Sequence, residues 1–379
     1  MRRGSLLVSV VTAMILATEG IASAQIGKSV AVAAGTPEDA EVSAIYAAQD
    51  PAQKVALLDK FSAEHATGDL ALLADQLYVS AYIAEKNYDK AFEYGDKALT
   101  IDPDSFETAV NLVRAAEQSG DSTKMLHYGD ITGGILARYK ASPAPAGGSA
   151  ADWEQTKAEK LKAADPDVQY AEYAYYSSAV KTADPATRAQ MLDHYVAAFP
   201  DSPYTKNAEI GTVLAYQAAR DNAKMLDAAQ TALKDEPNNT TVLVLVADYW
   251  SDRNQQLTLA EADAKKALAA LPSVTKPEGL SDVQWQKQVS MQKGLALSAL
   301  GEVYVNQGKN VAAIQSFQQA SPLLKTDNFS YGRNLYRWGF TLAKMRRIAE
   351  ARRILTQAVN VDSPYRSLAR QTLEKIGGG

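Results

Sequence analysis

The chain repeats itself at a fixed offset, and this repetition limits what it can fold into. From Asp50 onward it matches itself from Asp184 onward, 134 positions later and without a gap. The matched pairs include Pro51 with Pro185, Leu58-Asp59 with Leu192-Asp193, Tyr82 with Tyr216, Ala98-Leu99 with Ala232-Leu233, and Pro103 with Pro237. Each copy also shows a shorter period of 34 residues, the length of one helix-turn-helix unit. Because a single helix pair cannot bury its own apolar face, repetition at this length predicts stacked helix pairs.

Apolar residues recur at three- and four-residue steps between the prolines, and no segment shows a sustained strand alternation. Pairs of Asp or Ser followed by Pro mark the expected helix boundaries, because the first residue can cap a helix and proline fits its first turn. These pairs are Asp50-Pro51, Asp102-Pro103, Asp165-Pro166, Asp184-Pro185, Ser202-Pro203, Ser321-Pro322 and Ser363-Pro364. We therefore expect about a dozen helices joined by short turns.

The N-terminus has the pattern of a secretory signal peptide. Arg2 and Arg3 precede a short apolar run over residues 6–17, and Ala22-Ser23-Ala24 is a cleavage site of small residues. A run of about a dozen apolar residues is shorter than the roughly 20 that a membrane-spanning helix needs. We expect cleavage near Ala24 and an exported, periplasmic or secreted protein without a transmembrane span. The residues after Arg2-Arg3 favour the general secretory route over the twin-arginine route.

The absence of cysteine excludes several classes of protein. A disulfide framework, a thiol nucleophile, a thiolate metal site and a lipoprotein's acylated cysteine all require it. We divide the chain into a signal peptide (1–24), a flexible segment (25–36), a first helical block (37–140), a Pro/Gly/Ala linker (141–150) and a second helical block (151–379).

The shorter period resembles the tetratricopeptide repeat. The best match is Leu300-Gly301-Glu302-Val303-Tyr304, followed by Gly308, Ala313, Phe317 and Ala320. The resemblance implies an all-α, right-handed α-solenoid, in which Gly301 and Ala320 let two helices approach and Tyr304 and Phe317 fill the space between neighbours. Another unit keeps Tyr82, Ala91, Ala98 and Pro103. The family is a scaffold for many partners, so the resemblance does not name one.

Residues that could carry chemistry are few. His65, His127 and His194 lie at no spacing typical of metal ligands. Gly133-Gly134 and Gly147-Gly148 lack the Lys and Ser or Thr of a phosphate loop, so we interpret them as turn and linker residues. We expect no catalytic residues, no metal and no cofactor.

Charge is distributed unevenly along the chain. Residues 325–379 carry a net charge of +7, whereas residues 1–324 carry −12. On the helix expected over residues 330–345, a 100° step places cations and aromatic residues on one stripe. The stripe contains Arg333, Tyr336, Arg337, Phe340 and Lys344. Leu335, Trp338, Leu342 and Met345 fall on the opposite, core-facing side.

The stripe is the candidate partner-binding site, because arginine and rigid aromatic residues supply much of the binding energy in interfaces. A solvated terminal repeat is the simpler interpretation of the same charge. The leading hypothesis is a non-catalytic exported scaffold or adaptor for the assembly or maintenance of a bacterial cell envelope. It would bind a protein or peptide segment in the solenoid groove, and an acidic segment would suit the stripe. Replacing the three cations with Glu should then abolish binding without unfolding the protein. The alternatives are a structural homo-oligomer and a glycan-binding accessory protein or enzyme of the envelope; we expect no nucleic acid partner.

Overall fold

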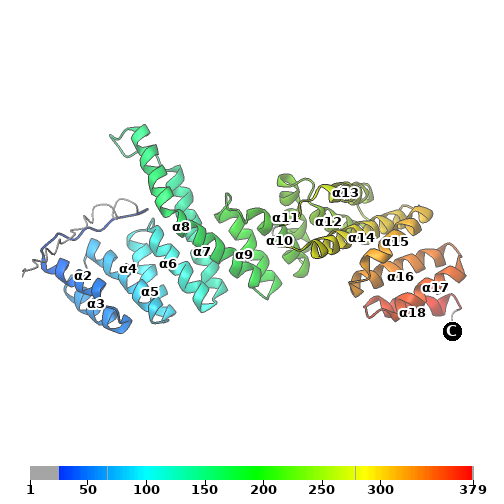
Figure 1. Cartoon of the computed structure of the whole chain (residues 1–379), viewed down its shortest axis with the longest axis horizontal. Coiled ribbons are helices and arrows are strands. Elements are labelled where there is room, and N and C mark those ends of the chain that lie inside the picture. The colour runs from blue at the N-terminus through cyan, green and yellow to red at the C-terminus, as the bar shows by residue number, and fades with distance from the viewer. Residues whose placement is uncertain (1–24, 66, 278, 378–379) are drawn as a thin grey trace, which may run out of the picture. The chain divides into compact units, whose positions relative to one another are not determined.

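The computed structural model describes residues 25–65, 67–277 and 279–377, and the predicted signal peptide lies outside them. These residues form α-helices, one 3-10 turn and connecting segments, and no strand occurs among them. The predicted all-α solenoid is therefore confirmed (Figure 1). None of the described helices is long and apolar enough to cross a membrane. The described residues divide into two compact units, those up to residue 208 (unit 1) and those from residue 209 onward (unit 2).

Unit 1 is a stack of consecutive helices in which each packs against its neighbours in the chain. Its helices are α2 (Pro37–Ala47), α3 (Pro51–His65), α4 (Asp69–Ala84), α5 (Tyr88–Ile101), α6 (Phe106–Ser119), α7 (Ser122–Ala141), α8 (Ala150–Lys181) and α9 (Pro185–Ala198). The division between the units falls inside α10 (Thr205–Ala218). The predicted Asp184-Pro185 boundary is confirmed, because Asp184 accepts a hydrogen bond from the backbone N–H of Thr187 and Pro185 opens α9.

The predicted linker over residues 141–150 separates two helices without dividing the unit. Residues 142–149 lie between α7 and α8 and are not helical, but α8 packs on α6, α7 and α9. Helices α8 and α9, which follow the linker, therefore share a core with the helices before it, and the division between the compact units falls at residue 208. Pro166 lies inside α8, and Pro322 lies inside α15 (Asn310–Leu324), so the predicted boundaries at Asp165-Pro166 and Ser321-Pro322 are wrong.

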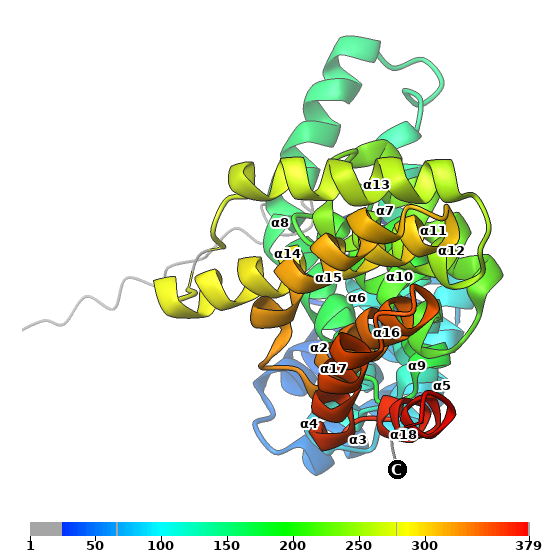
Figure 2. The same ribbon diagram turned by 90° about the vertical axis from the view of Figure 1, so that its right-hand side faces the viewer.

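Unit 2 contains three successive helix pairs and a final helix. They are α12 (Thr240–Asp252) with α13 (Leu257–Ala270), α14 (Asp282–Asn306) with α15 (Asn310–Leu324), α16 (Asn328–Lys344) with α17 (Ile348–Asn360), and α18 (Tyr365–Lys375); α11 (Asn222–Asp235) precedes them. Figures 1 and 2 both show α16, α17 and α18 side by side, in agreement with their packing. A short 3-10 turn, η1 (Leu271–Ser273), follows α13.

Close packing within the α14–α15 pair agrees with the tetratricopeptide-like pattern. A side chain added at Gly301 would place its Cβ 2.5 Å from Cε1 of Phe317, so only glycine fits there. Phe317 and Ala320 are fully buried. The residues that the pattern assigned to the contact between the two helices therefore lie in that contact.

The segment over residues 25–36 is held against unit 1, contrary to the expectation that it is loose. Ile26 is 2% exposed and belongs to the apolar core that also contains Phe106. The backbone N–H of Phe106 donates to the carbonyl of Ile26, and that of Lys28 donates to Asp102. A segment without helical periodicity can thus be ordered by contacts with distant residues.

Candidate functional site

Helix α16 carries the predicted binding stripe on one face and apolar core residues on the other. Asp327 caps the helix by accepting a hydrogen bond from the backbone N–H of Ser330 at 2.8 Å. Leu335 and Leu342 are fully buried in the core shared with α17, as predicted, and Trp338 packs against the same core. Arg333 and Arg337 of the stripe instead face α12, whereas Tyr336 packs at the edge of this core.

Two cations of the stripe are paired inside unit 2. We call Asp248, Asp252, Glu302, Arg333 and Arg337 the ion cluster. Arg333 Nη1 lies 2.6 Å from Asp248 Oδ2, and its Nη2 pairs with Asp252. Arg337 pairs with Asp252 as well, and its nitrogens lie 3.4 Å from carboxylate oxygens of Asp248 and Glu302. The cluster thus joins α12, α14 and α16, the first helices of three successive pairs.

The two arginines of the ion cluster are mostly buried, which limits their access to a binding partner. The side chain of Arg337 is only 7% exposed and that of Arg333 14%. Burial acts to raise the pKa of Asp248, but Arg333 and Arg337 outweigh it and hold that pKa below its usual value. Burial raises the pKa of Glu302, and the guanidinium groups offset only part of this effect. Both arginines are therefore already neutralised within the protein.

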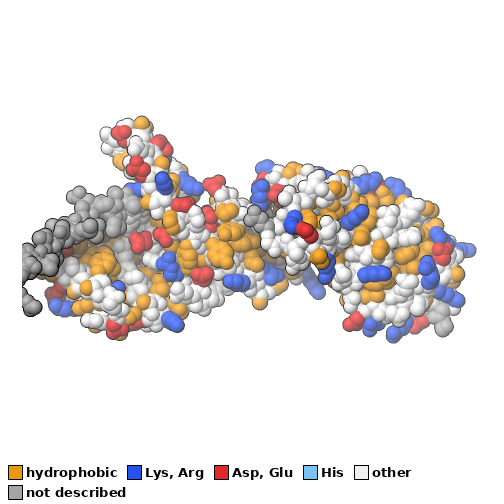
Figure 3. Space-filling model, viewed as in Figure 1, with side chains coloured by type: hydrophobic (Ala, Val, Ile, Leu, Met, Phe, Trp, Pro, Cys, Tyr) orange, Lys and Arg blue, Asp and Glu red, His pale blue; other side chains and the backbone are white. Residues whose placement is uncertain are grey.

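This arrangement corrects one expectation from the sequence. Glu at positions 333 and 337 would place five carboxylates together without a cation among the cluster residues. Since a buried unpaired charge costs several kcal/mol, the triple charge reversal would damage the fold and could not isolate a binding defect. Figure 3 shows other Lys and Arg side chains over the C-terminal helices, where they face the solvent.

The remaining stripe residues lie in a chain of aromatic rings. We call Phe329, Tyr336, Phe340 and Tyr365 the aromatic strip. Ring centroids are 5.6 Å apart for Phe329 and Tyr365, 6.0 Å for Tyr365 and Tyr336, and 5.9 Å for Tyr336 and Phe340. Phe329 is 50% exposed and Phe340 39% exposed. The ammonium group of Lys344 lies 5.6 Å from the Phe340 ring centroid, a cation–π contact at the end of the strip.

Sequence reasoning missed two members of the strip for different reasons. Phe329 lies four residues before Arg333 on the same face of α16, so the helical period could have included it. Tyr365 lies on α18, and no spacing within α16 predicts its position.

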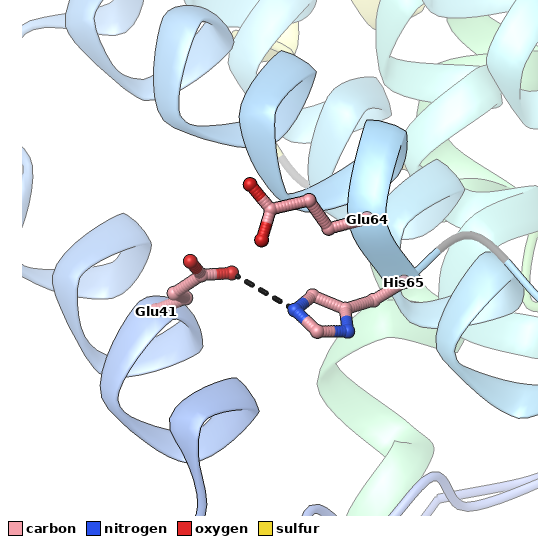
Figure 4. A group of neighbouring side chains, drawn as sticks. All are labelled: Glu41, Glu64 and His65. Carbon is pink, nitrogen blue, oxygen red and sulfur yellow. Dashed lines mark ion pairs between the residues drawn. The ribbon is translucent and has the colours of Figure 1, made fainter.

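A second polar group lies near the N-terminus. Glu41 of α2 and Glu64 and His65 of α3 point toward one another in Figure 4, and one potential ligand atom from each lies within 4.8 Å of the other two. An imidazole and two carboxylates can hold a divalent cation. However, His65 Nε2 is 3.3 Å from Glu41 and its Nδ1 is 3.7 Å from Glu38, so both ring nitrogens of His65 already have a carboxylate neighbour.

The structure also gives His194 a partner that its sequence neighbours did not suggest. Its Nδ1 lies 2.7 Å from Asp130 Oδ2, across the contact between α9 and α7. The hydroxyl of Tyr175 donates to the other oxygen of the same carboxylate at 3.3 Å. This network satisfies polar groups between packed helices.

Comparison with known proteins supports the repeat architecture and names no partner. Residues 76–105, which include most of α4 and all of α5, match the tetratricopeptide repeat family. They lie in a unit that the sequence pattern identified, so the resemblance is confirmed there. No curated protein matches the chain.

Among the solved structures that are similar to this chain, three examples each have 12% identity. The APC/C hetero-tetramer Cut9–Hcn1 has a TM-score of 0.44, and the match covers 90% of this chain and 64% of that one. Yeast Tom70 has a TM-score of 0.39 with 83% and 64% covered, and the P58(IPK) TPR domain 0.32 with 90% and 97%. The chain thus spans just under two thirds of the first two, and likeness at this level carries no functional argument. The protein is therefore an all-α helical-repeat protein in which residues 76–105 match one tetratricopeptide repeat.

Proposed function

We propose that this protein is an exported, non-catalytic scaffold that binds a segment of a protein partner at the aromatic strip of unit 2. The observation that carries the proposal is the exposure of Phe329 and Phe340 at the two ends of a continuous row of rings. Rigid aromatic side chains on a packed helix lose little conformational entropy on binding. The strip therefore offers apolar contact area that is already ordered.

The chemistry of the partner follows from Lys344. Within the described residues, its ammonium group has a cation–π contact and no ion pair. The arginines of the ion cluster are neutralised by carboxylates, so Lys344 supplies the free positive charge of the stripe. A segment with an apolar or aromatic side chain followed by a carboxylate would satisfy both features. An acidic partner segment therefore remains the proposal, with Lys344 and not Arg333 or Arg337 as the cation that it would contact.

Site-specific photo-crosslinking in cells that produce the mature protein tests this proposal. One variant carries the crosslinking amino acid at Phe340, and a matched control carries it at Val311 of α15, an apolar position of the same unit that is 62% exposed. We expect position 340 to capture one protein that position 311 does not, and Lys344→Glu to reduce the capture. A purified segment of the captured protein should then bind the wild-type protein directly.

Other outcomes contradict the proposal. Capture of only a second copy of this chain would favour the structural oligomer, and equal capture at both positions would mean that the strip has no specificity. Capture of glycan-bearing material without protein would favour the glycan-binding alternative.

A further inference from the structure

The segment that precedes α2 docks on unit 1 in an extended conformation. We call residues 25–33 the strap. In Figure 1 it runs past the starts of α4 and α6 toward α8. Its side chains alternate after Lys28: Val30 and Val32 are half-buried against the core of α2–α4, whereas Ser29, Ala31 and Ala33 are exposed. This period of two is typical of an extended segment with one face on a surface.

Four groups from separate elements hold the first residues of the strap. Lys160 of α8 donates from Nζ to the carbonyl of Gln25 at 2.9 Å, and the backbone N–H of Phe106 donates to the carbonyl of Ile26 at 3.2 Å. The backbone N–H of Lys28 donates to a carboxylate oxygen of Asp102 at 2.7 Å. The side-chain ammonium of Lys28 lies 2.5 Å from a carboxylate oxygen of Asp69.

The site is selective for the residue type at each position. Ile26 is 2% exposed, so its position requires an apolar side chain. Gly27 has a φ of +103°, and a Cβ there would come within 2.6 Å of the Asp104 carbonyl oxygen and 2.7 Å of an Asp102 carboxylate oxygen. Glycine is therefore required for both conformation and space. The ammonium group of Lys28 pairs with the carboxylate of Asp69, so this position favours a cation, whereas the bond to Asp102 uses only the backbone N–H.

We propose that this edge of unit 1 is a binding site for an extended protein segment with the pattern apolar–Gly–basic, and that the strap is its resident occupant. The strap uses backbone hydrogen bonds, one buried anchor and one ion pair, which is the way folded domains bind extended peptides. None of the four contacts that hold residues 25–28 involves Ala34, Gly35 or Thr36. Gly35 has a φ of +80°, and open space surrounds it. Ala34 and Gly35 therefore connect the strap to Thr36, the N-cap of α2, and the strap contacts can form without chain continuity. This site is in unit 1 and does not depend on the strip proposed for unit 2.

Restoring the strap in trans tests the inference. The probe is a synthetic peptide of residues 25–36 with a fluorophore at its C-terminus, and binding is measured by fluorescence anisotropy. Three mature proteins are compared: the wild type, Ile26→Asp in the full-length mature chain, and a deletion of residues 25–33. We expect the peptide to bind both variants and not the wild type, whose site is occupied. Peptides with Ile26→Asp or Gly27→Ala should bind at least tenfold more weakly.

Circular dichroism of each protein accompanies the titrations. If the deletion variant loses helix content, the full-length Ile26→Asp protein decides the question. The inference is overturned if no helical variant binds the peptide, if the wild type binds it equally well, or if the altered peptides bind as tightly as the parent. It is also overturned if both variants lose their helices, because the strap would then be an inseparable part of the core.

Discussion

Replacing Arg337 with Met should destabilise unit 2, because it removes a cation from the ion cluster without leaving a large cavity. Arg337 is 7% exposed and lies near Asp248, Asp252 and Glu302. In the variant, three carboxylates would face Arg333 alone. Removing one partner from a buried ion pair costs about 3–5 kcal/mol. Since Asp252 is 43% exposed and solvent screens its share, we expect a loss at the lower end, about 3 kcal/mol at pH 7.

Glu302→Gln is the matched control in the same cluster. Burial raises the pKa of Glu302, so folding disfavours the ionised form of this carboxyl. The amide removes that penalty and leaves two carboxylates with two guanidinium groups. We expect its stability to lie within about 1 kcal/mol of the wild type, or above it.

The assay is urea unfolding followed by tryptophan fluorescence in a Trp153→Phe background. Trp153 lies in unit 1, and the other three tryptophans, Trp250, Trp285 and Trp338, lie in unit 2, so the signal reports unit 2. Asp248 adds a pH signature. Its pKa is lowered in the folded state, so its stabilising effect is present above about 3.8 and is lost as the pH falls through the lower folded value. The difference between the wild type and Arg337→Met should therefore shrink in acid. A loss below about 1 kcal/mol at pH 7, or an equal loss in Glu302→Gln, would refute the reasoning.

Three further predictions concern single residues of unit 1. Burial raises the pKa of Asp75 to about 6, so the folded protein favours the protonated carboxyl and its free energy of unfolding declines as the pH rises from about 4 to 6. Asp75→Asn should therefore raise the free energy of unfolding at pH 7 by about 1–3 kcal/mol in urea titrations, and an unchanged midpoint would contradict this. Gly133→Ala would bring a Cβ within 2.5 Å of the Ala198 carbonyl oxygen and should lower the free energy of unfolding by about 1–3 kcal/mol. The neighbouring Gly134→Ala, whose Cβ would meet only Arg138 at 3.4 Å, should be neutral or stabilising by up to about 1 kcal/mol. A larger loss of stability in Gly134→Ala than in Gly133→Ala would be inconsistent with the packing. Sequencing the N-terminus of the exported protein should give Gln25 as its first residue, and an intact Met1 would argue against signal-peptide cleavage.

The repeat architecture could be predicted from the sequence, because helical periodicity and helix pairing leave local signs. The buried positions of Leu335 and Leu342 followed from the 3.6-residue period of α16. Local residue patterns predict the structure less reliably where contacts between distant helices determine the role of a residue. The Gly133-Gly134 pair predicts a turn, yet both residues lie inside α7, where the end of α9 leaves no room for a side chain at Gly133.

The candidate site could be predicted only in part. The period of α16 placed Arg333 and Arg337 on one face, and the structure agrees. It did not indicate that Asp248 and Asp252, more than 80 residues earlier, lie against that face. A charged helix stripe has the same spacing whether it faces water or a neighbouring helix, so spacing alone cannot separate a binding surface from an internal ion cluster.

The sequence by itself determined the helical class, the repeat unit and the faces of individual helices, because these depend on residues within one or two turns of each other. Only the tertiary structure decided which charges are neutralised, which aromatic rings meet and where residues 25–33 lie. Those outcomes depend on contacts between residues far apart in the chain, such as Gln25 with Lys160 and Tyr336 with Tyr365. Such contacts arise only when the helices pack, and no local pattern of residues encodes them.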